Sequence, residues 1–351
     1  MNRGPGSPGE ADPAHPFDVD AALDPGRFPV DEWALVESEY SVHDLGTTET
    51  LFALGNGYLG LRGNAEEGRD AHTHGTFVNG FHETWSIQHA EDAFGFAKVG
   101  QTLVHVPDPK LIKLYVNDEP LLVGEADCEE YSRRLDFRTG TLERTLLWRT
   151  PAGERLQVRS TRQVSFTERH LTLMTLEVTL LEGVAPVTVS SQLLNRQDGQ
   201  DEYHVADAAL GEGDDPRQAQ PMDHRVLLPR LSRVRNGRAT LGYCCANSQM
   251  TVACAVEHLV EADCELKVKT EVDDDTAKSV VHTRMVAGQT LKITKFAAFH
   301  TSRGVPPDEL ADRCDDTLDR AIKRGADALT LDQRHWLDDF WERSDVVVAD
   351  R

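Results

Sequence analysis

One stretch of the chain, residues 51–85, combines many glycines with many side chains that could act on a ligand. Glycine accepts backbone conformations that other residues avoid, and it lets a ligand approach the main chain closely. Polar side chains on loops of this kind often carry function. The candidates in this stretch are Asn56, Tyr58, Arg62, Asn64, Glu66, Glu67, His72, His74, His82, Glu83 and Trp85.

Gly55, Gly57 and Gly60 have the GxGxxG spacing of a dinucleotide-binding loop. That site requires a helix beginning at the third glycine, within a βαβ unit. Here Gly63 and Asn64 follow almost at once and would break such a helix, and the later part of the chain has an antiparallel β pattern. A nucleotide site is therefore disfavoured, and the sequence also has no P-loop and no GxSxG motif.

A metal site is a second alternative, since His72, His74, His82 and His89 could all be ligands. A further ligand with suitable spacing is not visible, however. Loop histidines that form hydrogen bonds with the backbone are the preferred interpretation. We therefore predict no metal site and no cofactor.

Glu66, Glu67 and Glu83 could supply carboxylates for glycosyl transfer. That chemistry needs two groups flanking the scissile bond, or one acid with an external nucleophile. The sequence does not place these acids at such a separation, and solvated loop acids are the preferred interpretation. Aromatic residues that could stack on a sugar, or could instead be core or interface residues, are Trp33, Tyr58, Phe81 and Trp85.

The chain of 351 residues has a net charge of −22. This charge argues strongly against nucleic acid and an anionic membrane as partners, because both would be repelled. The sequence lacks the run of about 18 apolar residues that a membrane-spanning helix needs, and residues 1–17 lack the apolar segment of a secretion signal. The six cysteines have no CxxC spacing, so we expect reduced thiols and a cytoplasmic protein.

The elements that must position the candidate side chains follow a polar tail. Residues 1–26 begin with a segment rich in proline and glycine, and we expect this tail to be disordered. Within residues 27–300, apolar residues recur at every second position from Lys110 onward, with turn residues between the segments. This pattern predicts a large antiparallel β-sandwich rather than a barrel. We expect the acidic residues 198–224 to form a surface loop.

Residues 301–343 change to a helical period and predict a two-helix linker. A proline–acid sequence at residues 306–309 starts the first helix, and Gly325 separates it from the second. The apolar positions of the second helix give it an aromatic face that needs a packing partner. These positions are Leu329, Trp336, Leu337, Phe340 and Trp341. Residues 344–351 are predicted to start a further domain, so the fold class is a mainly β sandwich followed by two helices.

The segment at residues 49–63, ETLFALGNGYLGLRG, resembles the N-terminal signature of glycoside hydrolase family 65, which includes maltose, trehalose and kojibiose phosphorylases. The resemblance continues through residues 75–81, GTFVNGF, and residues 165–171, SFTERHL. It ends with residues 336–348 and covers roughly residues 30–351, with its blocks in the order of the family.

The resemblance implies a β-sandwich and helical linker that precede an (α/α)6 catalytic barrel and a small C-terminal sheet. It also implies an inverting reaction in which a barrel glutamate protonates the glycosidic oxygen while phosphate attacks the anomeric carbon, giving β-glucose 1-phosphate and a free sugar. Some relatives use water instead. No residue here matches the catalytic positions, so we assign no catalytic residue to this chain.

The main hypothesis is therefore the N-terminal portion of a disaccharide phosphorylase or hydrolase, inactive alone. Its implied partners are a disaccharide, inorganic phosphate, the barrel domain and a second copy in a homodimer. Residues expected to face the active site or the barrel are Asn56, Tyr58, Arg62, His82, Glu83 and Trp85. A stand-alone carbohydrate-binding or interaction module is the alternative, and a hydrolase that uses Glu66, Glu67 or Glu83 is a weaker third hypothesis.

Overall fold

The structure is a computed structural model that describes residues 23–346, except residues 88, 90, 92 and 197–224. The expected surface loop at residues 198–224 lies outside the described residues, as do residues 1–22 of the expected tail and residues 347–351. Residues 23–26, also assigned to the tail, form a turn in which Phe28 N–H donates to the Asp24 carbonyl at 2.7 Å.

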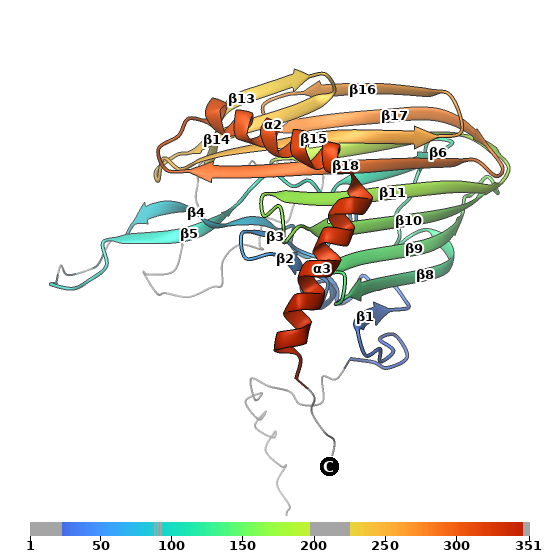
Figure 1. Ribbon diagram of the computed structural model, residues 1–351, viewed down its shortest axis with the longest axis horizontal. Coiled ribbons are helices and arrows are strands. Elements are labelled where there is room, and N and C mark those ends of the chain that lie inside the picture. Colours follow the sequence, from blue (N-terminus) through green and yellow to red (C-terminus); the bar gives the residue numbers. More distant parts are fainter. Residues whose placement is uncertain (1–22, 88, 90, 92, 197–224, 347–351) are drawn as a thin grey trace, which may run out of the picture.

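The described strands form three antiparallel sheets, so the predicted mainly β fold is confirmed (Figure 1). The nine-stranded sheet contains, in spatial order, β1 (Ala34–Glu37), β8 (Asp127–Asp136), β9 (Thr141–Arg149), β10 (Arg155–Val164), β11 (Leu171–Glu182), β18 (Thr290–Ser302), β15 (Thr251–Ala262), β14 (Arg238–Cys245) and β13 (Leu227–Arg235). The five-stranded sheet contains β16 (Leu266–Val272), β17 (Thr276–Val286), β12 (Val184–Leu194), β6 (Ile112–Val116) and β7 (Glu119–Pro120). The four-stranded sheet contains β2 (Leu54–Gly55), β3 (Leu59–Leu61), β4 (Thr76–Ser86) and β5 (Val99–His105).

The main core joins alternate residues of all three sheets. On β18, Ile293, Ala297 and Phe299 belong to this core, whereas Phe296 and Ala298 face the opposite side. Both faces of the strand are therefore buried in this part, which explains the apolar run FAAF at residues 296–299.

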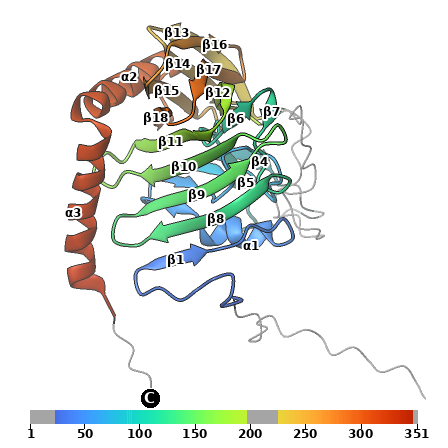
Figure 2. The same cartoon turned by 90° about the vertical axis from the view of Figure 1, so that its right-hand side faces the viewer.

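Helix α2 (Pro307–Arg324) covers the outer face of the nine-stranded sheet, packing against β15 and β18. Small residues on these strands, Ala253, Ala255 and Ala298, contact the apolar side of the helix and allow it to lie close to the sheet. The chain then turns at Gly325, and helix α3 (Ala326–Ser344) runs past the ends of β8 to β11 (Figure 2). The two predicted linker helices are thus present.

The glycine-rich stretch differs from the expected loop. Residues 45–51 form helix α1 (Leu45–Leu51), for which the sequence has no helical pattern of the usual length. The stretch then contains β2, β3 and the 11-residue strand β4. His82, Glu83 and Trp85 therefore lie on a strand, in the part where residues 82–86 pair in continuous register with residues 99–103 of β5, beyond a register shift between Phe77 and His82.

Candidate functional site

Asn56 fixes the tight turn between β2 and β3. Its side-chain oxygen accepts hydrogen bonds from the Tyr58 and Leu59 N–H groups at 2.9 and 2.8 Å. Its amide nitrogen donates to the carbonyls of Ser165 and Arg169 at 2.6 and 3.0 Å. Asparagine is suited to this position because its short side chain can hydrogen-bond to nearby backbone groups. Asn56 therefore joins two of the segments that resemble the family, residues 49–63 and residues 165–171, the second of which contains the turn between β10 and β11.

Tyr58 lies at the same junction. Its hydroxyl donates to the Phe299 carbonyl at 3.3 Å, and its ring packs edge-on against His170 with centroids 4.3 Å apart. The His170 ring in turn stacks on His300, with centroids 4.0 Å apart. Burial raises the pKa of the Tyr58 hydroxyl, so this group stays neutral. The tyrosine anchors the turn, and only part of its ring is exposed.

Arg62 points toward α1. Its guanidinium donates to the Gly46 carbonyl at 3.3 Å and to Glu49 at 3.4 Å. The same Glu49 carboxylate accepts the backbone N–H groups of His72 and Thr73 at 2.8 and 3.1 Å. Arg62 and Glu49 therefore hold the segment between β3 and β4 against the helix.

Glu83 is fully buried. Its carboxylate accepts hydrogen bonds from the N–H groups of Asn247, Ser248 and Thr84 at 2.9, 2.6 and 2.8 Å. The Ser248 hydroxyl also donates to the His82 carbonyl at 2.7 Å. This carboxylate closes the turn between β14 and β15 onto β4, and its oxygens already have donors.

Trp85 lies on the same face of β4 as Glu83. Its ring lies over Gly100 of β5, where an added Cβ would lie 2.2 Å from the ring. The other proposed platform residues do not share this surface. Phe81 is fully buried, and Trp33 instead packs edge-on against Trp341 with centroids 5.6 Å apart.

Glu66 and Glu67 form a buried ion-pair cluster with two arginines of the nine-stranded sheet. Arg144 binds Glu67 with two hydrogen bonds of 2.8 and 2.7 Å and lies 3.0 Å from Glu66. Arg162 donates to Glu66 at 3.2 Å. Burial by itself would raise the pKa of Glu66, but the two guanidinium groups outweigh it and hold the pKa below its usual value. Glu66 is therefore ionised at neutral pH and has no proton for general acid catalysis.

The space beside this cluster is too small for a sugar. A cavity of about 10 Å³, lined by Tyr40, Glu66, Tyr131 and Arg144 among others, can hold a single water molecule at most. The structure therefore argues against the hypothesis that Glu66 and Glu67 form a hydrolytic pair. They are not solvated loop acids either, because both are buried.

A second buried cluster was not found from the sequence. The Lys110 ammonium donates to Asp108 at 2.8 Å and to the Gly75 carbonyl at 2.9 Å. His74 lies 3.8 Å from the same Asp108 carboxylate. Burial lowers the pKa of Lys110 to about 8 even though Asp108 opposes the shift. Burial also lowers the pKa of His74 to about 3, so its imidazole is neutral.

Lys295 is a third buried group, and it connects two sheets. From β18 its ammonium donates to the carbonyls of Pro109 and Gln192 at 2.5 and 2.6 Å. Burial lowers its pKa to about 7. The sequence signal for these buried charges was the period-two pattern itself. Arg144, Arg162 and Lys295 are in phase with inward apolar neighbours such as Leu146, Val158 and Ile293.

The described residues include no group of three His, Cys, Asp or Glu side chains that could hold a metal ion. All six cysteines are free. No helix in the described part of the chain is long and apolar enough to cross a membrane.

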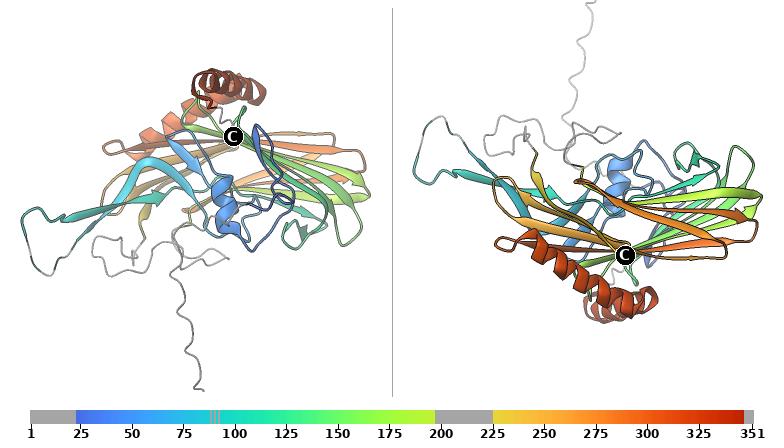
Figure 3. Two further views of the ribbon diagram at one scale, coloured as in Figure 1. Left: turned by 90° about the horizontal axis from the view of Figure 1, so that it is seen from below. Right: turned by 90° about the horizontal axis from the view of Figure 1, so that it is seen from above.

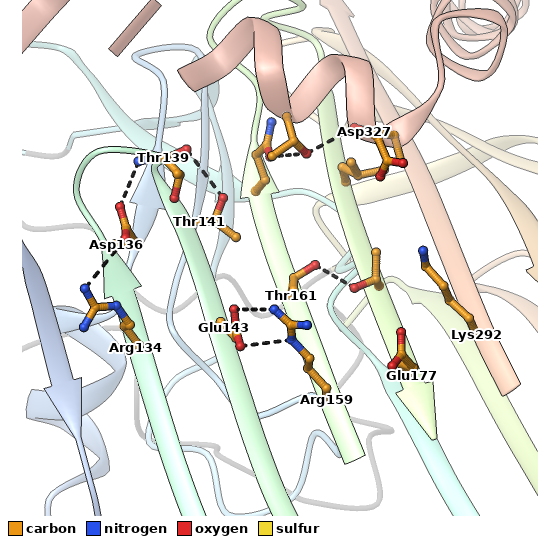
Figure 4. A pocket seen from close by; sticks show the side chains of 15 residues that line it. Arg134, Asp136, Thr139, Thr141, Glu143, Arg159, Thr161, Glu177, Lys292 and Asp327 are labelled. Atoms are coloured by element: carbon orange, nitrogen blue, oxygen red, sulfur yellow. Dashed lines mark hydrogen bonds and ion pairs between the residues drawn. The ribbon is translucent and has the colours of Figure 1, made fainter. Parts of the chain in front are cut away.

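A polar groove of about 430 Å³ lies on the outer face of the nine-stranded sheet beside α3 (Figure 4). Arg159 and Glu143 face each other on its floor with two hydrogen bonds of 2.9 and 3.0 Å, and Thr161 bonds to Thr175 at 2.6 Å. Glu177, Lys292 and Asp327 also line it. These groups can form hydrogen bonds with a neutral polyol, and both signs of charge are present.

An exposed aromatic strip runs along α3. Trp336 stacks on Phe166 of the β10–β11 turn with centroids 4.3 Å apart, and Phe340 lies 5.8 Å from Trp336. Trp336 is 40% exposed and Phe340 is 37% exposed. The predicted aromatic face is thus only partly covered, since the buried side of α3 consists of Leu329, Gln333 and Leu337. The strip adjoins the β2–β3 turn, because Asn56 bonds to Ser165 beside Phe166.

These features define a large β-sandwich domain with a helical extension, in which the candidate acids hold the fold together. Residues 35–340 match the glycosyl hydrolase family 65 N-terminal domain, and the chain belongs to this family.

The chain is similar to several proteins named as glycosyl hydrolases or disaccharide phosphorylases. It is 34% identical over 321 residues to an uncharacterized glycosyl hydrolase of Mycobacterium tuberculosis, covering 92% of this chain and 39% of that protein. It is 28% identical over 325 residues to the alpha,alpha-trehalose phosphorylase of Thermoanaerobacter brockii, covering 92% of this chain and 41% of the relative. It shares the fold of a putative kojibiose phosphorylase from the human microbiome, with a TM-score of 0.77 and 16% identity over 92% of this chain and 40% of that chain. The chain therefore spans about two fifths of these relatives.

Proposed function

We propose that this chain is the N-terminal portion of an inverting α-glucoside disaccharide phosphorylase, or of a related hydrolase, whose catalytic acid lies outside these residues. Family membership and the phosphorylase relatives support this function. In the proposed reaction, a disaccharide and inorganic phosphate give β-glucose 1-phosphate and a free sugar in the cytoplasm. We also propose that the full protein acts as a homodimer.

The proposal rests on the hydrogen bonds that the buried carboxylates of Glu66, Glu67 and Glu83 already make. Glu66 and Glu67 are saturated by arginines, and Glu83 is saturated by backbone N–H groups. A glycosidase needs an acid and a base or nucleophile on opposite sides of an accessible bond, and these three buried side chains do not provide that arrangement. The reacting groups are therefore assigned to the part of the protein that the relatives have and this chain does not.

The aromatic strip and the β2–β3 turn are the proposed contact surface for that catalytic domain. Trp336 and Phe340 are large apolar groups that are left partly in water, and such patches mark interaction sites. In this proposal Asn56, Tyr58 and Arg62 hold the backbone of this surface in place through their hydrogen bonds. His82, Glu83 and Trp85 lie on β4 and would support a neighbouring part of it.

The purified 351-residue chain tests the proposal directly. We expect it to release no glucose 1-phosphate when it is incubated with phosphate and maltose, α,α-trehalose or kojibiose. We also expect it to release no glucose from these disaccharides when phosphate is left out. Turnover that Glu83→Gln or Glu66→Gln abolishes would overturn the proposal, because the catalytic acid would then lie within this chain. The coding sequence beyond Arg351 gives an independent check, since the proposal requires an open frame that encodes a helical catalytic domain.

A stand-alone carbohydrate-binding module is the second candidate, and the polar groove beside α3 favours it. If the groove binds a sugar, calorimetric titration with a disaccharide panel should show binding that Lys292→Ala and Asp327→Ala weaken. Lys323→Ala on α2 is a suitable control because this lysine does not line the groove. Absence of heat at millimolar sugar would count against this candidate.

A further inference from the structure

The hairpin of β4 and β5 projects from the body of the molecule as an arm (Figures 1 and 3). It forms the outer half of the four-stranded sheet, in which β5 is the last strand. Among the described residues, β5 pairs with β4 alone, so the other edge of residues 99–103 presents unpaired backbone groups. An edge of this kind is a template for another strand.

The other sheet edges have features that discourage such pairing. β1 has four residues, and β2 and β7 have two each. The two longer edges carry proline or charge, which are common protections of edge strands. The residues concerned are Pro229, Arg230, Arg233 and Arg235 on β13, and Lys267, Lys269 and Glu271 on β16. By contrast, the seven residues of β5, VGQTLVH, include no Asp, Glu, Lys or Arg.

The exposed side chains of β5 are apolar or neutral. Val99 is 58% exposed and Leu103 is 54% exposed, with Gln101 midway between them. His82 and Thr84 of β4 lie on the same face, because the register places them opposite Leu103 and Gln101. In a chain with a net charge of −22, two copies repel each other, and this repulsion is weaker at a contact surface without acidic side chains. This strand is such a place.

The hydrogen-bond pattern shows which residues present the free edge. Ile87 N–H donates to the Lys98 carbonyl at 2.9 Å, so Lys98 directs its backbone groups toward β4. Backbone direction alternates along an antiparallel strand. Gly100 and Thr102 therefore also bond toward β4, whereas Val99, Gln101 and Leu103 direct their N–H and C=O groups outward.

From this geometry we propose that the arm is a dimerisation element, in which β5 pairs antiparallel with β5 of a second copy about a two-fold axis at Gln101. Gln101 then exchanges both backbone hydrogen bonds with Gln101 of the second copy. Val99 lies opposite Leu103 of the second copy, and Leu103 lies opposite its Val99. The strand is self-complementary about Gln101, as a closed two-fold interface requires. The four-stranded sheets of the two copies become one continuous sheet.

The proposal deepens the homodimer of the proposed function by naming its surface, and it does not depend on catalysis. A paired β5 satisfies the open edge and covers Val99 and Leu103 together. The two-fold pairing also specifies which side chains face each other across the interface. Charges placed at these positions therefore test the register as well as the location.

The test uses the 351-residue chain in sedimentation velocity over a range of micromolar concentrations. The unchanged chain should be a dimer. Val99→Lys alone and Leu103→Glu alone should each raise the dimer Kd by about tenfold or more, because a charge would face an apolar side chain. The double variant should restore the dimer, since each lysine then faces a glutamate of the second copy. Val268→Lys on β16, an edge residue with 54% exposure, is the matched control and should leave the Kd unchanged.

Circular dichroism verifies that each variant is folded. A dimer that Val99→Lys and Leu103→Glu do not weaken, or a double variant weaker than either single variant, would overturn the arm as the interface. In those cases the homodimer itself would still stand. A monomer at about 100 μM, far above a micromolar Kd, would overturn both the homodimer and the arm. Phosphorolysis assays run in parallel report on the catalytic part of the proposed function separately.

Discussion

Arg144 and Arg159 lie on neighbouring strands and each binds one glutamate with two hydrogen bonds. Arg144 holds Glu67 at 2.7 and 2.8 Å inside the sandwich, and Arg159 holds Glu143 at 2.9 and 3.0 Å on the outer face. The pairs have similar geometry but different surroundings. Water can replace a lost partner on the outer face, whereas removal of Arg144 leaves two carboxylates in the interior.

We therefore predict that Arg144→Ala lowers the free energy of unfolding by about 3–5 kcal/mol. The matched change Arg159→Ala should lower it by less than about 1 kcal/mol. Urea denaturation followed by circular dichroism measures both. Similar losses for the two variants would show that the interior of the sandwich is far more hydrated than the structure indicates.

The partners of the buried acids could not be predicted from the sequence, because they lie far from the acids along the chain. The types and spacing of Glu66, Glu67 and Glu83 identified them as notable acids. Their partners, however, lie 77 to 165 positions away, at Arg144, Arg162 and Ser248. No local pattern gives such a pairing. The inward phase of Arg144 and Arg162 was the one available signal, and a charged residue in that phase implies a buried partner without naming it.

At the scale of elements, Gln333 attaches α3 to the turn between β8 and β9 and to the end of β10. Its side-chain nitrogen donates to the Thr139 carbonyl at 2.9 Å, and its oxygen accepts from the Gln163 amide at 3.0 Å. The helical period predicted this helix and the apolar positions Leu329 and Leu337, which are buried, but it did not predict that Gln333 is buried between them. A buried amide with both ends bonded fixes where the helix lies and in which direction it faces.

Gly140 is the position where this contact is closest. An added Cβ would lie 2.8 Å from the Gln333 amide nitrogen and 3.0 Å from Leu337, and the φ of Gly140 is 60°. Gly153→Ala is a suitable control, since its φ is 98° but nothing lies within 4 Å of the added Cβ.

We predict that Gly153→Ala costs about 1 kcal/mol from its backbone conformation alone, and that Gly140→Ala costs more and loosens α3. Limited proteolysis should then cut Gly140→Ala within α3 before it cuts Gly153→Ala. Equal cleavage of the two variants would show that α3 is not held by this contact.

At the scale of the whole molecule, the sandwich keeps several histidines neutral. Burial lowers the pKa of His74, His258 and His300 to about 3 each. In the unfolded chain each would titrate near 6.5. Between these two values the unfolded state binds protons that the native state does not. Stability is therefore highest, for these groups, above about pH 6.5, and it is lost progressively as the pH falls toward 3.

His258 isolates this effect because it is partly buried on β15 and contacts the Ser191 hydroxyl at 2.8 Å, and the nearby Lys295 ammonium would repel an added positive charge. We predict that the melting temperature of the chain falls between pH 7.5 and pH 5, and that His258→Gln reduces this fall, because glutamine can keep a hydrogen bond to Ser191 without binding a proton. His43→Gln, at an exposed position before α1, is the control and should leave the pH dependence unchanged. Differential scanning calorimetry at both pH values measures the effect. An equal fall in the unchanged chain and in His258→Gln would mean that other groups, such as the buried carboxylates, control acid stability.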